Sequence, residues 1–265
     1  FKLACSSAAG GLRMIAIGLV PEFTVEAAKR AALGAGAKVL KTFSYKLTSK
    51  EIEEIVNISP DIILLTGGTD GGDRETIIHN AAALAHANIS SPIIVAGNKE
   101  VADEIERILS EHHKEIKIAD NVLPELGRLN IEPVKEAIRQ LFMESIIYAK
   151  GIAEVEGMID DILMPTPTAV LKAVQLLADG VGEEEGIGEL IAIDLGGATT
   201  DVHSIAKGKP TKAKVIKRGL PDPYAQRTVE GDLGLRISAP TLLEAAGEEM
   251  ILAKSGLKKL SFNLR

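Results

Sequence analysis

Short apolar runs alternate with amphipathic stretches over the first 120 residues of the chain. Apolar runs predict strands at about residues 13–20, 38–43, 61–66, 92–96 and 116–119. The stretches between them predict helices at about residues 24–36, 49–57, 74–87 and 99–112. Strands that alternate with helices of this length indicate parallel βαβ units with right-handed crossovers. We therefore expect an α/β fold, with a Rossmann-like layered sheet over about residues 13–120. The run at 61–66 shows no alternation, which predicts a strand buried on both faces.

Hydrogen-bonding side chains mark three of the helix starts. Thr48 and Glu51 have the spacing of a capping box, in which each side chain satisfies a backbone N–H group of the other residue. Thr241 and Glu244 have the same spacing and predict the start of the last helix. Thr24 follows Pro21 and is expected to cap the helix that runs through an alanine-rich stretch.

The second half of the chain has a different pattern. Residues 131–150 predict one long helix and residues 168–178 another, followed by a flexible acidic connector at 180–188. An apolar strand at 190–193 and a threonine-rich strand at 199–205 predict a hairpin, and 213–217 predict a third strand. Residues 219–236 are expected to be loop-rich. We therefore divide the chain into a Rossmann-like α/β region at 1–150 and a second unit at 151–265.

The tip of the predicted hairpin carries residues suited to a phosphate group. Two glycines form a turn that residues without a Cβ accept most easily, and their backbone N–H groups can face an anion. Threonine hydroxyls add donors, and carboxylates can hold Mg²⁺ through its waters. The residues are Asp194, Gly196, Gly197, Thr199, Thr200 and Asp201. The alternative is an ordinary glycine turn without a ligand.

A second glycine-rich turn follows the apolar strand at 61–66. A strand, a glycine turn and a helix N-terminus together form a potential anion site, because the first helical N–H groups are unpaired. The candidate residues are Gly67, Gly68, Thr69, Asp70 and Gly71. Their spacing matches neither a dinucleotide-binding motif nor a P-loop, so a tight turn between sheet and helix remains an equal alternative.

Composition limits the classes of function. The 265 residues are 46% hydrophobic, which is enough for a substantial core, and the net charge of −7 with scattered Lys and Arg argues against non-specific nucleic-acid binding. Cys5 is the only cysteine, so an intrachain disulfide is impossible, and we expect it to be a buried structural thiol. No apolar run approaches the length of a membrane span, and we expect no secretory leader, because no charged-then-apolar segment is found at the start. A cytoplasmic location is expected.

Three motifs carry a resemblance to a known family. DLGGATTDVHS at the hairpin resembles the phosphate-binding hairpin of actin, sugar kinase and Hsp70 ATPases. Together with RTVEGDLGLR downstream and LLTGGTDGG upstream, it resembles the MutL family, accessory proteins of adenosylcobalamin-dependent mutases such as glutamate mutase. The resemblance extends over nearly the whole chain.

This resemblance implies a fold and a function. The implied fold for 151–265 is the ribonuclease-H-like subdomain of actin-type ATPases. The implied function is an ATP-driven, chaperone-like reactivating factor that exchanges damaged cobalamin for fresh cofactor, with a mutase subunit as partner and ATP or ADP with Mg²⁺ as cofactors. Asp194 and Asp201 would hold the metal shell, and Glu230 or Asp232 would orient the attacking water.

Other functions remain open at this stage. A small-molecule kinase shares the hairpin, and a non-catalytic assembly module could hold a mutase subunit. Homo-oligomers are possible. Family members carry an earlier phosphate loop and a later adenosine loop, neither of which is found here, so we expect the chain to be an internal fragment. That expectation leaves hydrolysis by this chain undecided.

Overall fold

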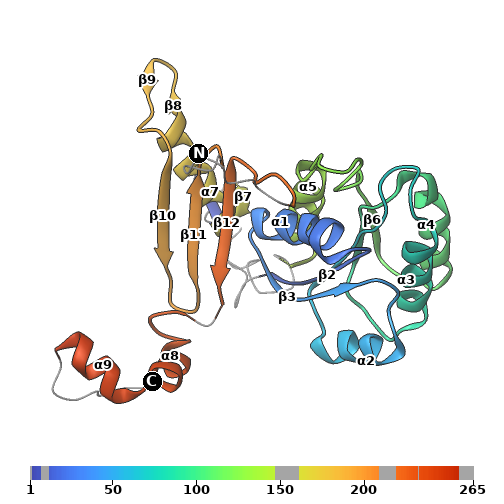
Figure 1. Cartoon of the computed structure of the whole chain (residues 1–265), viewed down its shortest axis with the longest axis horizontal. Coiled ribbons are helices and arrows are strands. Elements are labelled where there is room, and N and C mark those ends of the chain that lie inside the picture. Colours follow the sequence, from blue (N-terminus) through green and yellow to red (C-terminus); the bar gives the residue numbers. More distant parts are fainter. Residues whose placement is uncertain (1, 7–11, 147–160, 209–218, 232, 257–265) are drawn as a thin grey trace.

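The computed structural model describes residues 2–6, 12–146, 161–208, 219–231 and 233–256. Within these residues the chain forms a mixed α/β fold with a five-stranded sheet and a three-stranded sheet as its two largest (Figure 1). The two larger sheets lie in different parts of the molecule, with α1 between them (Figure 1).

The five-stranded sheet is parallel throughout. Its order is β3-β2-β4-β5-β6, and every neighbouring pair runs in the same direction. The strands are β2 (Leu12–Gly18), β3 (Ala37–Ser44), β4 (Ile62–Leu65), β5 (Ile93–Val95) and β6 (Ile116–Ile118). All five lie where the apolar runs predicted strands, so the expectation of parallel βαβ units is confirmed.

Helices cover both faces of this sheet. On one face lie α1 (Glu26–Gly34) and α5 (Glu132–Leu141), and on the other lie α2 (Ser49–Ile58), α3 (Glu75–His86) and α4 (Ala102–Glu111). Strand β4 contributes Ile62 and Leu64 to the first core and Ile63 and Leu65 to the second, all with no exposed surface. The prediction of a strand buried on both faces is confirmed, and burial of each such side chain stabilises the fold by about 1.5–3 kcal/mol.

The three predicted helix starts have different outcomes. Thr48 and Glu51 form the capping box: Glu51 N–H donates to Thr48 Oγ1 (3.3 Å) and Thr48 N–H to the Glu51 carboxylate (2.8 Å). The prediction for Thr24 was wrong, because a π-helical turn η1 (Pro21–Val25) precedes α1 and Thr24 Oγ1 instead accepts from Leu19 N–H (2.7 Å). The capping box at Thr241 was also wrong, since α8 (Ala239–Ala246) already starts at Ala239 and no side chain caps it.

The three-stranded sheet contains the predicted hairpin. Strands β10 (Leu190–Leu195) and β11 (Thr200–Ile205) are antiparallel, and Asp194 lies opposite Asp201. The third strand is β12 (Ala225–Glu230), paired with β11. The expectation of a loop at 219–236 was therefore wrong over β12, because polar residues alternate along this strand and mask its character in the sequence. The strand predicted at 213–217 lies outside the described residues.

The remaining elements connect the two sheets and extend the second. Helix α7 (Thr166–Asp179) packs Leu171, Val174 and Ala178 against Ile205 of β11. Strand β1 (Leu3–Ser6) pairs in parallel with β7 (Asp161–Pro165), although residues 3–6 fall in the predicted first region. Cys5 on β1 is exposed, so the expectation of a buried thiol was wrong.

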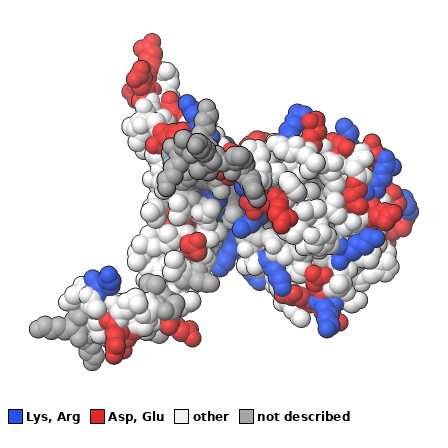
Figure 2. All heavy atoms as spheres, viewed as in Figure 1, with Lys and Arg blue, Asp and Glu red and all other residues white. Residues whose placement is uncertain are grey.

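Two more expectations need correction. The stretch expected to be a flexible connector forms a small hairpin of β8 (Gly180–Val181) and β9 (Glu184–Glu185), and acidic side chains gather at its tip (Figure 2). The helix expected at 131–150 ends at Leu141 and continues as a π-helical turn η3 (Phe142–Ile146), beyond which 147–160 are outside the described residues. The domain boundary at 150 falls in that gap and stays a prediction.

The described part is completed by a short 3₁₀ turn, η2 (Lys99–Val101), before α4 and by α9 (Glu248–Ser255) after α8. Helices α8 and α9 lie beyond the loop end of the β10–β12 sheet (Figure 1). Among the described helices, none is long and apolar enough to cross a membrane.

Candidate functional site

The loop between β10 and β11 lies at a cavity of about 320 Å³. Five of the six residues predicted for the hairpin site line it: Asp194, Gly196, Gly197, Thr199 and Asp201. The opposite wall comes from the parallel-sheet region, with Gly36 and Lys38 at the start of β3. The start of α7 also contributes, through Pro165, Thr166 and Pro167. The volume is within the range of small-molecule sites, so the fold places the predicted residues around a space that a ligand could fill.

The carbonyl groups of the hairpin loop are bound by a second segment of the chain. Leu235 N–H donates to Gly196 O (3.0 Å), and the N–H groups of Arg236 and Ile237 donate to Gly197 O (2.9 and 2.7 Å). Gly234 allows this contact, because a Cβ there would lie 2.5 Å from the Ala198 carbonyl carbon. The RTVEGDLGLR motif therefore supports the hairpin loop from one side.

The N–H groups of Gly197 and Ala198 have a different environment. Among the described residues, none accepts a hydrogen bond from either group. Backbone N–H groups without a protein partner are available to water or to an anionic ligand. The carbonyl groups of the loop are therefore already hydrogen-bonded, whereas two of its N–H groups remain available to a ligand.

The two glycines of the loop are not required by its backbone conformation. Neither Gly196 nor Gly197 has a positive φ angle, so our expectation that the turn itself demands residues without a Cβ was wrong. A Cβ at Gly197 would meet Arg236 Cβ at 3.8 Å, which is an ordinary contact. A glycine that neither torsion angle nor packing requires is typical of a site where another group approaches the backbone closely.

The two predicted threonine donors are already engaged. Thr199 Oγ1 donates to Asp201 (3.2 Å), and Thr200 Oγ1 donates to the Leu233 carbonyl (2.7 Å). Thr200 does not line the cavity. Their role as phosphate donors stays a prediction, and the geometry favours a role in shaping the loop.

Arg227 holds Asp201 from the neighbouring strand. Its Nε donates to Asp201 Oδ1 (2.7 Å), and its terminal nitrogens form an ion pair with Asp201 and donate to the carbonyls of Leu33 (3.1 Å) and Ala37 (2.8 Å). Both charged residues are buried. Burial lowers the pKa of Arg227, while the adjacent Asp201 carboxylate acts in the opposite direction. The pair therefore ties the hairpin sheet to α1 and β3, which favours a structural role for Asp201 over direct metal binding.

His203 lies beside this ion pair on the same face of the sheet. It has no exposed surface, and neither ring nitrogen has a hydrogen-bond partner within the described part of the chain. Burial is the largest effect and lowers its pKa, the Asp201 carboxylate opposes it, and the Arg227 guanidinium lowers it further. The imidazole is therefore neutral at physiological pH. The sequence did not indicate this, because the burial of His203 depends on elements that pack against the sheet.

Two positive features near the cavity were not found from the sequence. Lys38 Nζ donates to Gly231 O (3.3 Å) and extends from the parallel sheet toward the hairpin. Helix α7 begins at the cavity without a side-chain cap, so its positive dipole end is directed there. Pro165 and Pro167 indicated this helix start in the sequence, but nothing in the pattern showed that it would meet the hairpin.

The remaining predicted residues lie elsewhere. Glu230 is exposed at the end of β12 and does not line the cavity, and Asp232 lies outside the described residues. Their role in orienting water stays a prediction.

Several N–H groups of the glycine-rich loop at 67–72 form hydrogen bonds within the protein. Asp70 N–H donates to Pro124 O (3.0 Å), and Gly71 N–H donates to Asn98 Oδ1 (3.2 Å). Asp73 accepts from Thr76 N–H (3.1 Å) and so occupies the N-terminus of α3. Gly68 has φ +70° and no room for a Cβ, which would lie 2.3 Å from Asp73 O. The anion site proposed for Gly67, Gly68, Thr69, Asp70 and Gly71 stays a prediction, and these contacts favour the tight-turn alternative.

Comparison with known proteins shows the family to which this chain belongs. The family model described as MutL protein matches residues 1–265. The chain belongs to the MutL family. A curated Protein MutL of Clostridium tetanomorphum is 61% identical over 246 residues, which cover 93% of this chain. This MutL-family chain spans about half (53%) of the length of that relative.

Proposed function

We propose that this MutL-family chain binds the phosphates of ATP at the β10–β11 hairpin and serves as part of an ATP-dependent reactivating factor for an adenosylcobalamin-dependent mutase. The observation that supports it most directly is the loop itself. Gly197, which neither its torsion angles nor its packing require to be glycine, and two N–H groups with no acceptor among the described residues lie at a cavity of about 320 Å³. Such a loop can take a phosphate oxygen without rearrangement.

The electrostatics of the cavity agree with an anion. Lys38 and the uncapped start of α7 place positive charge and a positive dipole end on the wall opposite the loop. Arg227 contributes little to a ligand directly, because its donors already bind Asp201 and two carbonyls. We therefore assign Lys38, Gly197 and Ala198 to the phosphate.

The cavity also offers a carboxylate that could hold Mg²⁺ together with a bound nucleotide. Asp194 is an exposed carboxylate on the cavity wall, and among the described residues no cluster of three or more His, Cys, Asp or Glu could form a full metal cage. Mg²⁺ in such sites uses one or two carboxylates, waters and the phosphates themselves. Asp194 would hold the ion's water shell, and Asp201 would position the loop through Thr199. The metal's chemistry there would be to neutralise charge on the phosphates.

We assign the β10–β12 sheet to the ribonuclease-H-like unit of actin-type ATPases and the parallel sheet to a Rossmann-like region. The support is a three-stranded antiparallel meander with its phosphate loop at the first turn, and the order β3-β2-β4-β5-β6 with helices on both faces. In such proteins the nucleotide changes the angle between lobes, which would strain a bound mutase and open its cofactor pocket.

A substitution at Gly197 tests the phosphate role with little structural cost. Gly197→Val adds a side chain where the ligand would lie, at a position with no positive φ and no close neighbour. We expect isothermal titration with Mg-ATP to give binding for the wild type and at least tenfold weaker binding for Gly197→Val and Asp194→Ala. Gly34→Ala on α1 is the matched control, because its Cβ would meet only the Lys135 side chain at 3.5 Å. Equal heats for wild type and Gly197→Val would refute the proposal.

The partner is tested separately. We expect a pull-down with an adenosylcobalamin-dependent mutase to recover a complex whose amount changes with nucleotide. A complex that does not respond to nucleotide would support the non-catalytic assembly module instead. Failure to form a complex in either state would refute the mutase partner. Phosphorylation of a small molecule by the chain would support the kinase alternative.

A further inference from the structure

A second cavity, of about 400 Å³, opens at the carboxyl ends of β4, β5 and β6. It shares no lining residue with the hairpin cavity. The walls are the loop after β4, the segment from Gly97 to the start of α4, and the loop that follows β6. In parallel α/β sheets, ligands bind outside the carboxyl ends of the strands. The position of this cavity is therefore one where a ligand is expected on topological grounds.

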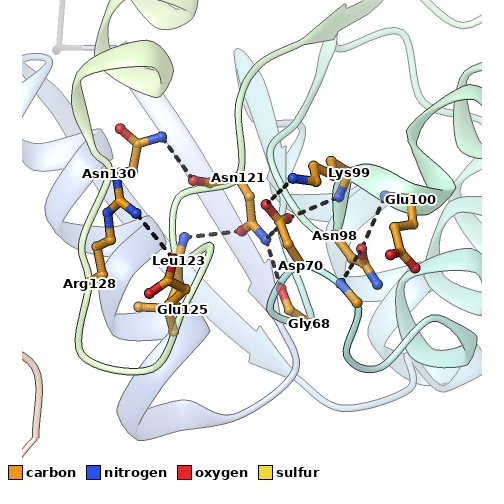
Figure 3. Close-up of polar contacts among 11 residues, drawn as sticks. Gly68, Asp70, Asn98, Lys99, Glu100, Asn121, Leu123, Glu125, Arg128 and Asn130 are labelled. Carbon is orange, nitrogen blue, oxygen red and sulfur yellow. Dashed lines mark hydrogen bonds and ion pairs between the residues drawn. The ribbon is translucent and has the colours of Figure 1, made fainter.

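A network of side-chain amides holds the walls in place (Figure 3). Asn121 is buried; its Nδ2 donates to Asp70 Oδ1 (2.8 Å) and Gly68 O (3.1 Å), and its Oδ1 accepts from Leu123 N–H (3.0 Å). Asn130 Nδ2 donates to Asn121 O (3.2 Å), and this bond joins the beginning and the end of the loop that follows β6. Such a satisfied network fixes the cavity before any ligand enters.

The charged groups of the cavity are mostly paired with one another. Lys99 Nζ lies 3.5 Å from the Asp70 carboxylate, and Arg128 lies 3.1 Å from Glu125. Burial acts to raise the pKa of Asp70, but hydrogen bonds from Asn121 and Lys99 and the Lys99 charge outweigh it and hold that pKa below its ordinary value. Asp70 therefore stays ionised and keeps Lys99 occupied.

Asp120 is the exception. It is exposed in the loop just after β6, it lines the cavity, and among the described residues none forms a hydrogen bond or ion pair with its carboxylate. An anionic ligand would face this carboxylate and compete with two existing ion pairs. A ligand with hydroxyl or amine donors would instead satisfy it.

Polar atoms form the larger part of the cavity lining, and apolar residues form the rest. The apolar residues, which we call the floor of the cavity, are Val95, Ala102, Ile118, Ala119 and Pro124. An apolar floor does not suit a bare metal ion, and the described residues contain no cluster of three or more ligating side chains that could hold one. A flat, largely apolar ring would cover this floor and leave its polar substituents near Asp120.

We propose that this cavity binds an uncharged nucleoside, with the base against the apolar floor and the ribose hydroxyls donating to Asp120. Carboxylates at the carboxyl edge of parallel sheets accept hydrogen bonds from ribose in the same manner. The site is independent of the phosphate-binding hairpin, and neither proposal requires the other.

The test uses adenosine and uridine as probes for the whole 265-residue chain, with isothermal titration as readout. We expect at least one of them to bind the wild type, and Asp120→Asn to weaken that binding by about tenfold or more, because a charged acceptor becomes a neutral amide. Asp103→Asn on α4 is the matched control, since Asp103 is exposed and lies outside the cavity. The 2′,3′-dideoxy analogue and the 5′-monophosphate are both expected to bind more weakly than the parent nucleoside.

Three results would overturn the proposal. The first is that neither nucleoside binds the wild type, and the second is that Asp120→Asn binds as tightly as the wild type. The third is that Gly197→Val removes nucleoside binding. The last result would show that the nucleoside occupies the hairpin cavity, and would leave the phosphate proposal standing. Conversely, loss of Mg-ATP binding in Gly197→Val with nucleoside binding unchanged would support both sites.

Discussion

Replacement of Arg227 tests how the two sheets are held together. In Arg227→Met the side chain keeps most of its length and loses its charge. The wild-type guanidinium forms hydrogen bonds to Asp201 on β11 and to the carbonyls of Leu33 in α1 and Ala37 in β3. The variant therefore leaves a carboxylate and two carbonyl groups without their donor.

The expected loss of stability is large because both partners are buried. The side chains of Arg227 and Asp201 are 4% and 9% exposed, so solvent screens the remaining charge poorly. Removal of one member of a buried ion pair costs about 3–5 kcal/mol, mostly through the charge that remains. The exposed pair of Arg107 and Glu111, with side chains 63% and 60% exposed, provides the control, and Arg107→Met should cost less than about 0.5 kcal/mol.

Urea unfolding followed by circular dichroism measures both variants. A double variant, Arg227→Met with Asp201→Leu, removes the stranded charge, and we expect it to be more stable than Arg227→Met alone, with a coupling energy of at least about 1 kcal/mol. If Arg227→Met lies within about 1 kcal/mol of the wild type, the ion pair does not hold the sheets together. The same conclusion would follow if the double variant had the same free energy of unfolding as Arg227→Met alone.

Three further predictions concern single residues. Burial keeps the pKa of His203 below its ordinary value of 6.5, so just below pH 6.5 the unfolded chain binds more protons than the folded one. The contribution of His203 to the free energy of unfolding should be complete above pH 6.5. It should decrease by up to about 1.4 kcal/mol per pH unit as the pH falls, until the folded-state pKa is passed. Urea unfolding at several pH values should show this slope in the wild type and a shallower one in His203→Leu, and equal slopes would contradict the assignment. Thr48→Ala should lower the free energy of unfolding by about 1 kcal/mol, because it removes a complete capping box. Thr241→Ala is the control and should change that free energy little, because no side-chain cap forms there. Equal losses in the two variants would contradict a stabilising role for the capping box. Gly68→Ala should destabilise more than Gly127→Ala in thermal unfolding, since both glycines have positive φ (+70° and +82°) but only Gly68 lacks space for a Cβ; the reverse order would refute the reasoning.

Local rules in the sequence were sufficient for much of the fold. The five parallel strands follow from apolar runs, and the doubly buried β4 follows from the absence of alternation at 61–66. The Thr48 capping box and the β10–β11 hairpin also follow from short-range patterns, because caps and turns depend on residues only a few positions apart. The family motifs, too, can be read without coordinates.

Tertiary structure decided which of these residues share a site. The sequence places Lys38 and Gly197 about 160 positions apart, and only the packing of the two sheets brings both to one cavity. Strand β12 was hidden because Arg227 reads as a surface residue until Asp201 and two distant carbonyls bury it. Asp120, Asn121 and Asp70 likewise meet only because parallel strands end at the same edge of a sheet. Periodicity and capping record contacts along the chain, whereas these contacts join residues separated by long loops, whose partners depend on how the whole core packs.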